Sequence, residues 1–345
     1  RSLVLAAAIV LSAYGLVTLA GLPVDVFPDL NRPTVTVMVE APGLAPEEVE
    51  TQVTFPLETV LNGAPGVERV RTSSGIGLVV IWVEFGWETD IWHDRQVVQE
   101  RLNQAKEKLP PEVVPAMAPI SSIMGEIMLL GLSSDELDPM VVRTTADWVI
   151  RPRLLSVAGV AQITVMGGGV KQFQVLADPE KMRRYGITFK ELETALKEAN
   201  QNSSGGFVVM QHQEYLIRNL GRVRSLAEIE RSLVATRDNI PIRVSDVAEV
   251  RLGSMPKRGD GSVNGHRAVI LAIQKQPGAD TRSLTREIDN ALDELRVSLP
   301  KGMQLEPNLF RQVHFIESSI RNVAEALRDG SILVVIVLFL FLMNF

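Results

Sequence analysis

The sequence predicts an α+β fold in which two copies of a βαββαβ module follow one another and a small α+β subdomain is inserted into the second copy. On either side of this part it predicts one transmembrane helix and the start of another. Three observations support the prediction. Both ends are apolar and uncharged, an internal repeat covers much of the middle, and short strands replace the regular pattern where the repeat breaks off.

The apolar ends predict membrane segments. Leu3–Leu22 has no charge and the length of a bilayer span, about 20 residues, so 1–32 is interpreted as the first transmembrane helix and its exit segment. Ser331–Phe345 is equally apolar but shorter, and 311–345 is interpreted as a helix leading into a second span. A signal peptide is disfavoured, because the first apolar run exceeds a signal core and no small-residue cleavage site ends it. We expect further residues beyond both ends of a chain that begins at Arg1.

The overall composition excludes several classes of site and partner. The net charge is −6 without a block of like charges, so no nucleic-acid partner is expected. The chain has no cysteine, which excludes disulfides and thiolate metal sites. With 345 residues it has room for two or three domains with cores of their own.

Residues 33–120 are predicted to form the first module. Alternation over 33–41 indicates a strand, and Pro46 opens a helix with two acids in its first turn. The apolar stripe of this helix consists of Val49, Val53, Leu57 and Leu61. Two strands, 67–74 and 78–85, follow on either side of the turn Gly75-Ile-Gly77. A second helix runs from Ile91 to Leu109 and ends at Pro110-Pro111. A strand at 126–132 can follow.

The second module is predicted from self-similarity. A gapless alignment of the chain with itself places Pro46, Val49, Thr51, Leu61, Gly66, Val67 and Gly75 on Pro139, Val142, Thr144, Leu154, Gly159, Val160 and Gly168. The second copy predicts a helix over 139–156, strands 160–165 and 170–176 joined by a hairpin turn at Gly167-Gly-Gly169, and a helix that opens with a capping box from Thr188 to Glu191.

Residues 203–266 depart from this pattern. They contain short strands and turns and are interpreted as an inserted subdomain. The earlier pattern resumes with a strand at 268–275, a helix with an apolar stripe and a strand near 303–307. The second module is therefore assigned to 121–202 together with 267–310.

No local motif predicts catalysis or a cofactor. The four histidines, His93, His212, His266 and His314, are widely separated, and surface positions explain them better than a zinc site. Gly167-Gly-Gly169 lacks the lysine and hydroxyl of a phosphate loop and joins two strands. Because no nucleophilic triad or carboxylate pair stands out, the chain is predicted not to be an enzyme. No catalytic, cofactor-binding or metal residue is assigned.

The methionines leave one alternative open. Met124 and Met128 lie four residues apart, and Met210 and Met255 flank the inserted subdomain. Thioethers select soft ions such as Cu(I), but methionine also fills gaps in apolar cores. On a strand, Met124 and Met128 would share one face, which suits packing equally well. We favour packing and keep a soft-metal site as the alternative.

Several stretches resemble a known family. They are Leu22-Pro-Val-Asp-Val-Phe-Pro-Asp29, Pro33-Thr-Val-Thr-Val-Met38, Ala41-Pro-Gly-Leu-Ala-Pro-Glu-Glu-Val-Glu50, Asn62-Gly-Ala-Pro-Gly-Val-Glu-Arg-Val-Arg71 and Ser121-Ser-Ile-Met-Gly-Glu-Ile-Met128. Together they are similar to the N-terminal portion of inner-membrane pumps of the resistance-nodulation-division (RND) superfamily, in its heavy-metal efflux branch of Cus and Czc type. The resemblance implies that the repeats are ferredoxin-like porter modules and that 203–266 is a docking subdomain facing an outer-membrane channel.

The resemblance also implies the activity and the partners. Such a pump is a homotrimer in the bacterial inner membrane, with residues 33–310 in the periplasm, joined by a periplasmic adaptor (membrane fusion protein) and an outer-membrane channel. Proton influx drives export of metal cations such as Cu(I), Ag(I), Zn, Co or Cd. The proton-relay and metal-binding residues of these pumps lie outside this chain, so none is carried over. The alternatives are an RND exporter of organic solutes or drugs and a non-transporting, membrane-anchored periplasmic scaffold.

Overall fold

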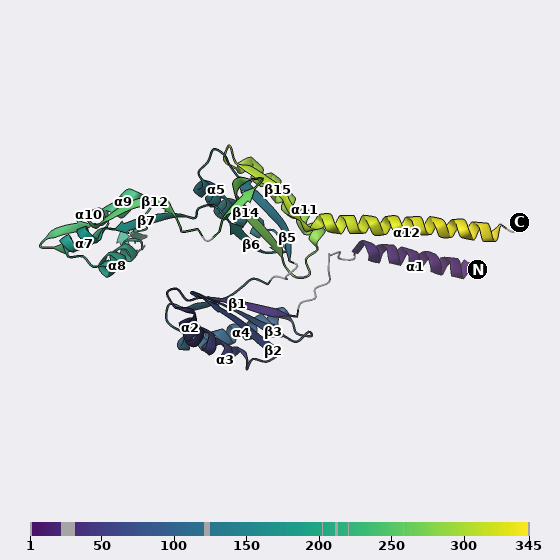
Figure 1. Cartoon of the computed structure of the whole chain (residues 1–345), viewed down its shortest axis with the longest axis horizontal. Helices are drawn as coiled ribbons and strands as arrows, with labels where there is room; N and C mark the ends of the chain where they lie inside the picture. Colours follow the sequence, from purple (N-terminus) through teal and green to yellow (C-terminus); the bar gives the residue numbers. More distant parts are fainter. Residues whose placement is uncertain are drawn as a thin grey trace. The chain divides into compact units, whose positions relative to one another are not determined.

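The computed structural model describes residues 2–21, 32–120, 125–201, 203–210, 213–219, 221–257 and 259–343. The fold mixes helices and strands, as predicted (Figure 1). Backbone contacts divide the chain into two compact units. Unit 1 comprises Arg1–Ser133, Ala146–Met166 and Val269–Phe345, and unit 2 comprises Ser134–Thr145 and Gly167–Ala268.

The first sheet of unit 1 contains four antiparallel strands. They are β1 (Thr34–Glu40), β2 (Val67–Gly75), β3 (Leu78–Phe85) and β4 (Val114–Met117), in the order β2-β3-β1-β4. The helices that accompany them are α2 (Pro46–Val49), α3 (Phe55–Leu61) and α4 (Ile91–Ala105). The sequence does not predict β4, a short edge strand that contains Pro115. The strand predicted at 126–132 belongs to the second sheet and not to this one.

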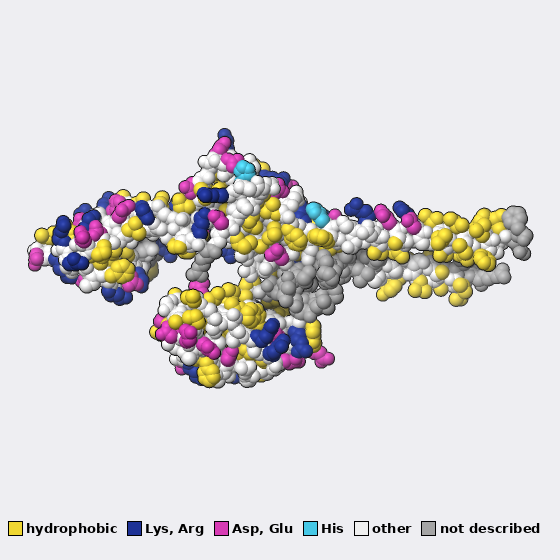
Figure 2. Space-filling model, viewed as in Figure 1, with side chains coloured by type: hydrophobic (Ala, Val, Ile, Leu, Met, Phe, Trp, Pro, Cys, Tyr) yellow, Lys and Arg dark blue, Asp and Glu magenta, His cyan; other side chains and the backbone are white. Residues whose placement is uncertain are grey.

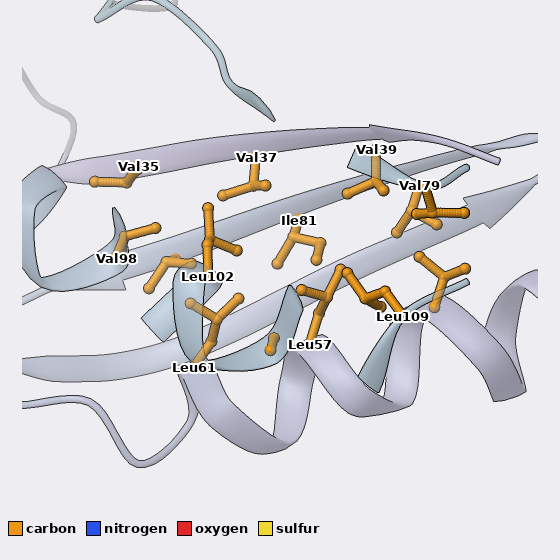
Figure 3. Close-up of a cluster of buried hydrophobic side chains, with 14 of the residues drawn as sticks. Val35, Val37, Val39, Leu57, Leu61, Val79, Ile81, Val98, Leu102 and Leu109 are labelled. Carbon is orange, nitrogen blue, oxygen red and sulfur yellow. The ribbon is translucent and has the colours of Figure 1, made fainter. Parts of the chain in front are cut away.

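One continuous hydrophobic core joins this sheet to its helices. Val35, Val37 and Val39 of β1 alternate toward the helices, and Leu57 and Leu61 of α3 meet them from the other side (Figure 3). All five side chains are fully buried. Burying a side chain of this size stabilises the fold by about 1.5–3 kcal/mol, so the predicted helix stripe is a main source of stability.

The first helix of each copy contains a π-helical turn that the sequence pattern does not predict. The two turns are Glu50–Thr54 and Ala146–Ile150. A proline, Pro56 or Pro152, stands near the start of the α-helical segment that follows each turn. Because proline has no N–H to donate, it interrupts the α-helical ladder, and a wider turn is one way to pass it without ending the helix.

The second sheet contains the matching elements of the second copy. Its strands are β5 (Glu126–Ser133), β6 (Val160–Met166), β13 (Gly261–Val263), β14 (His266–Lys275) and β15 (Gln304–Arg311), in the order β13-β14-β5-β15 with β6 also paired to β14. Its helices are α5 (Pro139–Thr145), α6 (Arg151–Leu155) and α11 (Thr281–Ser298). The order β6-β14-β5-β15 corresponds to β2-β3-β1-β4 in the first sheet.

Two backbone hydrogen bonds identify β14 as the counterpart of β3. The Gly86 N–H, directly after β3, donates to the Gly66 carbonyl at 3.3 Å. The Gln276 N–H, directly after β14, donates to the Gly159 carbonyl at 2.7 Å. Gly66 and Gly159 are a matched pair in the repeat, and both have positive φ. The resemblance between the copies therefore resumes at β14.

The hairpin predicted at Gly167-Gly-Gly169 is wrong. The two strands that flank these glycines are not paired: β6 pairs with β14, and β7 (Lys171–Ala177) pairs with β12 (Ala248–Ser254). A strand–glycine–strand pattern is local, whereas pairing depends on distant residues, so the sequence does not separate a hairpin from a chain that leaves the sheet.

The helices that follow β3 and β14 also correspond, because each begins after an aspartate that caps it, Asp90 before α4 and Asp280 before α11.

Unit 2 has a hydrophobic core of its own. Its other elements are α7 (Pro179–Tyr185), α8 (Phe189–Ala199), β8 (Ser203–Met210), β9 (Gln213–Asn219), α9 (Leu226–Arg231), β10 (Leu233–Arg237), β11 (Ile240–Arg243) and α10 (Val244–Val247). Met182, Ile187 and Leu192 pack with Ile229 and Val247. The predicted capping box is present at the start of α8. Residues 171–202 are predicted from the sequence to belong to the second module, but the contacts place them in unit 2.

Long helices stand at the two ends of the described chain: α1 (Ser2–Gly21) and α12 (Gln312–Leu342). Figure 2 shows hydrophobic side chains on the outer part of α12, and residues 317–343 are all exposed. Within the described residues, no helix meets the length and hydropathy needed to cross a membrane. The transmembrane segments predicted within 1–32 and 311–345 are therefore not confirmed, and residues 22–31 lie outside the described part.

Candidate functional site

The histidines considered in the sequence do not form a cluster in the described structure. His93, His266 and His314 are exposed on α4, β14 and α12, and His212 lies outside the described residues. The Nδ1 of His266 is 3.5 Å from a carboxylate oxygen of Asp135. Searched over the described residues alone, the chain has no group of three or more His, Asp or Glu that could hold a metal ion.

The methionines occupy different environments. Met128 on β5 is fully buried, which agrees with its interpretation as a core residue. Met210 and Met255 are 60% and 50% exposed. Met124 lies outside the described residues, so the proposed shared face with Met128 stays a prediction.

The triple glycine is a tightly packed loop within unit 2. Gly167 has φ +79°, and a Cβ placed there would lie 2.6 Å from the Ala268 carbonyl oxygen and 2.7 Å from the Gly261 nitrogen. The Nη1 of Arg143 donates a hydrogen bond of 2.7 Å to the Gly167 carbonyl. Ser254 would lie 2.9 Å from a Cβ on Gly169. Close packing against the backbone explains Gly167, and close packing against side chains explains Gly169.

A charged cluster occupies the face of the first sheet that points away from its helices. Glu84 of β3 is opposite Arg69 of β2 in the strand register. Nε and Nη2 of Arg69 donate to Oε2 of Glu84 at 2.9 and 2.7 Å, and Nη2 of Arg71 is 2.7 Å from Oε1. The Glu84 side chain is 8% exposed, whereas the arginines are 62% and 58% exposed. One carboxylate is thus held between two cations that reach solvent.

The electrostatics of this cluster favour an ionised Glu84. Burial acts to raise the pKa of Glu84, but hydrogen bonds and Coulombic attraction from Arg69 and Arg71 outweigh it and hold the pKa below the ordinary value. The guanidinium of Arg71 also lies over the ring of Trp82, 5.9 Å from its centroid. A sheet face with two accessible arginines and a tryptophan can bind a partner that is anionic, aromatic or both.

Asp94 is a second carboxylate with a perturbed environment. It lies in the first turn of α4 and is 1% exposed. Burial raises its pKa, partly offset by a hydrogen bond of 2.8 Å donated by the Thr89 hydroxyl. Among the described hydrogen bonds, its side chain has this one local partner, which indicates a structural role at the start of the helix.

The β8–β9 hairpin of unit 2 presents an apolar surface. The two strands form a two-stranded sheet with each other. Phe207, Val209 and Met210 are 60–68% exposed, and Tyr215 is 51% exposed. In the strand register, Phe207 and Val209 lie on one face of the hairpin, and Met210 and Tyr215 lie on the other. An isolated two-stranded hairpin is at best marginally stable in water, and exposed apolar side chains on both faces favour contact with another protein. The hairpin is the best candidate in unit 2 for contact with another protein.

Sequence reasoning missed both surfaces. Arg69 and Arg71 lie two residues apart on β2, so they share one face of the sheet, and Glu84 lies on β3. Once the register of β2 against β3 is known, this spacing predicts an ion pair across the two strands. The sequence does predict short strands within 203–266, but it does not show that their apolar side chains stay exposed.

Comparison with known proteins places these features in a family. The chain matches the AcrB/AcrD/AcrF family over residues 1–345. It is 34% identical over 353 residues to the cation efflux system protein CzcA of Alcaligenes sp. (strain CT14), covering 100% of this chain and 33% of that protein. It is 33% identical over 346 residues to the cation efflux system protein CusA of Escherichia coli (strain K12), covering 99% and 33%. A solved structure of a heavy metal efflux pump superposes with a TM-score of 0.90 at 28% identity, covering 100% of this chain and 34% of that one.

The coverage limits what can be transferred, because the chain spans about a third of the length of the curated relatives it matches. Fold and family follow directly, since the match includes every part of the chain. The chain belongs to the AcrB/AcrD/AcrF family of RND transporters, and it is similar to the cation efflux proteins CzcA and CusA and to a solved heavy metal efflux pump.

Proposed function

We propose that the chain is part of a proton-driven RND transporter that exports heavy-metal cations. The observation that carries the proposal is the likeness to a heavy metal efflux pump along the whole chain, at a TM-score of 0.90. Relatives named for resistance to cobalt, zinc and cadmium or to nickel, cobalt and cadmium support a divalent ion, and CusA is named only as a cation efflux protein. Within the described residues we assign a structural and gating role and no ion ligand.

The first and second sheets, with their helices, serve as ferredoxin-like porter modules in this proposal. The first module is 33–120. The second is best drawn as 121–166 with 269–310, and the docking subdomain as 167–268, because α7 and α8 share a core with α9 and α10. The boundaries expected from the sequence are 121–202 and 267–310 for the second module and 203–266 for the docking subdomain. The proposed division moves residues 167–202, which follow the point where the chain leaves the second sheet, from the second module to the docking subdomain.

The assembly in this proposal is a homotrimer that works with a periplasmic adaptor and an outer-membrane channel. The exposed hairpin β8–β9 supports it, since Phe207 and Val209 are 68% and 67% exposed in the described part of the chain, and apolar side chains of this size favour burial in an interface. A neighbouring protomer or the channel would supply that cover.

For location, we propose the bacterial inner membrane with residues 33–310 in the periplasm. The support is the uncharged α1 and the apolar outer part of α12, whose exposed side chains favour lipid or other membrane helices over water. Carbonate extraction of membranes tests this directly. Release of the protein into the soluble fraction would contradict it.

The transport function is tested in a strain that lacks the gene for the full-length protein. The deletion strain and a complemented strain are compared for growth with Zn²⁺, Co²⁺, Cd²⁺, Ni²⁺, Cu⁺ and Ag⁺. Everted membrane vesicles are then given the ion whose tolerance changes. We expect uptake that collapses when a proton ionophore is added. No change in tolerance to any of these ions contradicts the proposal.

The same experiment separates the alternatives. Sensitivity to dyes or antibiotics without sensitivity to metals would favour an exporter of organic solutes. Normal tolerance to all compounds, with loss of adaptor from the membrane fraction, would favour the non-transporting scaffold.

A further inference from the structure

The passage from the second sheet into α12 contains no loop. Strand β15 ends at Arg311 and α12 begins at Gln312. Arg311 has extended backbone angles, φ −142° and ψ 112°, so the chain changes direction at this one residue. Val313 and Ile316 of the first turn are 8% and 3% exposed. Because every described residue after Ile316 is exposed, the first turn alone packs α12 onto its module.

Two polar contacts attach the junction between β15 and α12 to α11. The guanidinium of Arg311 donates through Nη2 to both carboxylate oxygens of Asp289. The hydroxyl of Thr281 donates to Oε1 of Gln312 at 3.4 Å. Thr281 and Gln312 are 0% and 4% exposed. Thr281 and Asp289 are eight residues apart, roughly 12 Å along the axis of α11. The two contacts thus hold the start of α12 to α11 at two points along the axis of α11.

The Arg311 side of this contact is largely buried, and the hydrogen-bonding capacity of its guanidinium is not fully used. The Arg311 side chain is 12% exposed and that of Asp289 is 40% exposed. Nη1 donates to Asn308 at 3.1 Å. The remaining donor, Nε, is buried and has no hydrogen-bond partner among the described residues. A buried donor without a partner costs free energy. This cost reduces the free-energy difference between the observed position of the guanidinium and a position in which Nε reaches a partner or water. The contact therefore suits a joint that changes geometry.

We infer that Arg311 and Asp289 are positioning residues that transmit displacements of α12 to the second module. The inference deepens the proposed transport function and rests on it, since a proton-driven pump must carry movement between membrane and porter segments. The 31 residues of α12 extend roughly 46 Å, so a small rotation at Arg311 becomes a large displacement at the far end. Loss of the contact would leave both parts folded but would no longer couple them.

The first test measures geometry and needs no transported ion. The chain has no cysteine, so spin labels can be placed on α12 and α11 by Ser319→Cys and Glu287→Cys in the full-length protein, after replacement of any cysteine elsewhere in it. In liposomes we expect Asp289→Asn and Arg311→Gln to at least double the width of the distance distribution. The charge-swapped variant, Asp289→Arg with Arg311→Asp, should restore most of the narrow distribution.

A matched control is available on the same helix. Glu294 of α11 pairs with Arg153 of α6 at 2.6 Å, and both side chains are substantially exposed. Glu294→Gln removes an ion pair from α11 without touching α12. We expect the label distances to stay as in the parent protein. Unchanged distributions in the Arg311 and Asp289 variants, or equal broadening in Glu294→Gln, would overturn the inference.

The second test measures coupling in proteoliposomes with an imposed proton gradient, with Zn²⁺ and Ag⁺ as the probes. We expect Asp289→Asn and Arg311→Gln to lower ion transport at least tenfold at unchanged melting temperature, and Glu294→Gln to stay within twofold of the parent. If single variants fail to accumulate, the charge-swapped variant decides: recovery of both distance and transport supports the inference, and failure to recover either overturns it. If the parent transports neither ion, the transport proposal fails for those ions, while the distance measurement still tests the joint.

Discussion

Arg143 donates a hydrogen bond of 2.7 Å to the carbonyl oxygen of Gly167, at the point where the chain leaves the second sheet. Both residues belong to unit 2. Gly167 is the first residue of the segment that leaves the second sheet after β6 and returns to it at β13 and β14. A carbonyl fixed in this way holds the glycine at φ +79° against the Ala268 backbone. Gly167 is also the first residue of the second segment of unit 2.

Gly167→Ala should destabilise unit 2 by about 2–4 kcal/mol. A non-glycine residue at this φ costs roughly 1–2 kcal/mol, and the new Cβ would approach the Ala268 oxygen to 2.6 Å, which forces the backbone apart. Gly186→Ala is the control, because Gly186 has φ +63° but a Cβ added there would meet nothing within 4 Å, so only the conformational cost remains. Hydrogen exchange of β7 and β12 amides measures both. Equal effects of the two variants would contradict the close-packing account.

The elements with strong local signals could be predicted from sequence. Val49, Val53, Leu57 and Leu61 repeat at helical spacing, and all four are fully buried. The capping box between Thr188 and Glu191 depends on residues three apart and is also present. In both cases the determining contacts lie within a few residues along the chain.

The insertion point could not be predicted, because it depends on pairing between distant strands. The strand after Gly169 resembles the second arm of a hairpin whether it pairs with β6 or with β12, some 80 residues further on. The match between the copies resumes at β14, about 100 residues after the chain leaves the second sheet, so the offset between matching residues is no longer 93 there. The Arg69–Glu84 contact likewise needs the strand register, which composition and periodicity do not supply.

Glu84→Gln should destabilise the first module at neutral pH by about 1–2 kcal/mol. The amide cannot bind two guanidinium groups as the carboxylate does, and the arginines are largely exposed, so the loss is smaller than for a fully buried pair. The folded-state pKa of Glu84 lies below its ordinary 4.5, so its stabilisation is complete above pH 4.5 and is lost as pH falls through the folded value.

Urea titrations of the parent and of Glu84→Gln between pH 7 and pH 3 measure this difference, which should shrink toward the acid end. Glu68→Gln, on the neighbouring strand β2, is the control: the side chains of Glu68 and its partner Arg32 are 49% and 40% exposed, and this ion pair should contribute less than about 0.5 kcal/mol. A constant difference across the pH range would exclude ionisation of Glu84 as the cause.

Asp94→Asn should stabilise the folded protein at neutral pH, the opposite of the effect expected for Glu84→Gln. The pKa of Asp94 is raised above 3.8 chiefly by burial, so its charge destabilises the folded state at pH 7. The asparagine oxygen can still accept the hydrogen bond from Thr89. We expect equal or greater stability at pH 7, by up to about 1 kcal/mol, and no advantage once pH has fallen through the folded pKa and approaches 3.8. Thermal unfolding at pH 7 and pH 3.5 measures it, and a loss above 1 kcal/mol at pH 7 would assign the carboxylate a stabilising contact.

Phe207→Asp should impair assembly without impairing folding. Phe207 is 68% exposed, so its replacement should change the free energy of unfolding by no more than about 0.5 kcal/mol. A charge in an apolar interface leaves a desolvated, unpaired group, which weakens association strongly. Size-exclusion chromatography with light scattering in detergent reports the oligomer. Phe189→Asp, at an equally exposed aromatic on α8, is the control and should keep the parent's oligomeric state.

Met128→Leu separates the two interpretations of the methionines. Met128 is fully buried on β5 and contributes an apolar side chain to the core, and a leucine of similar volume should cost less than about 1.5 kcal/mol. A thioether ligand, by contrast, cannot be replaced by leucine, because leucine has no donor for a soft ion. We therefore expect tolerance to Ag⁺ and Cu⁺ to stay at the parent level in the full-length protein. Met128→Ala gives the complementary measurement: it should lower stability by about 2–5 kcal/mol through the cavity it leaves. If the leucine variant loses tolerance while its melting temperature is unchanged, Met128 acts on the ion and not on the core.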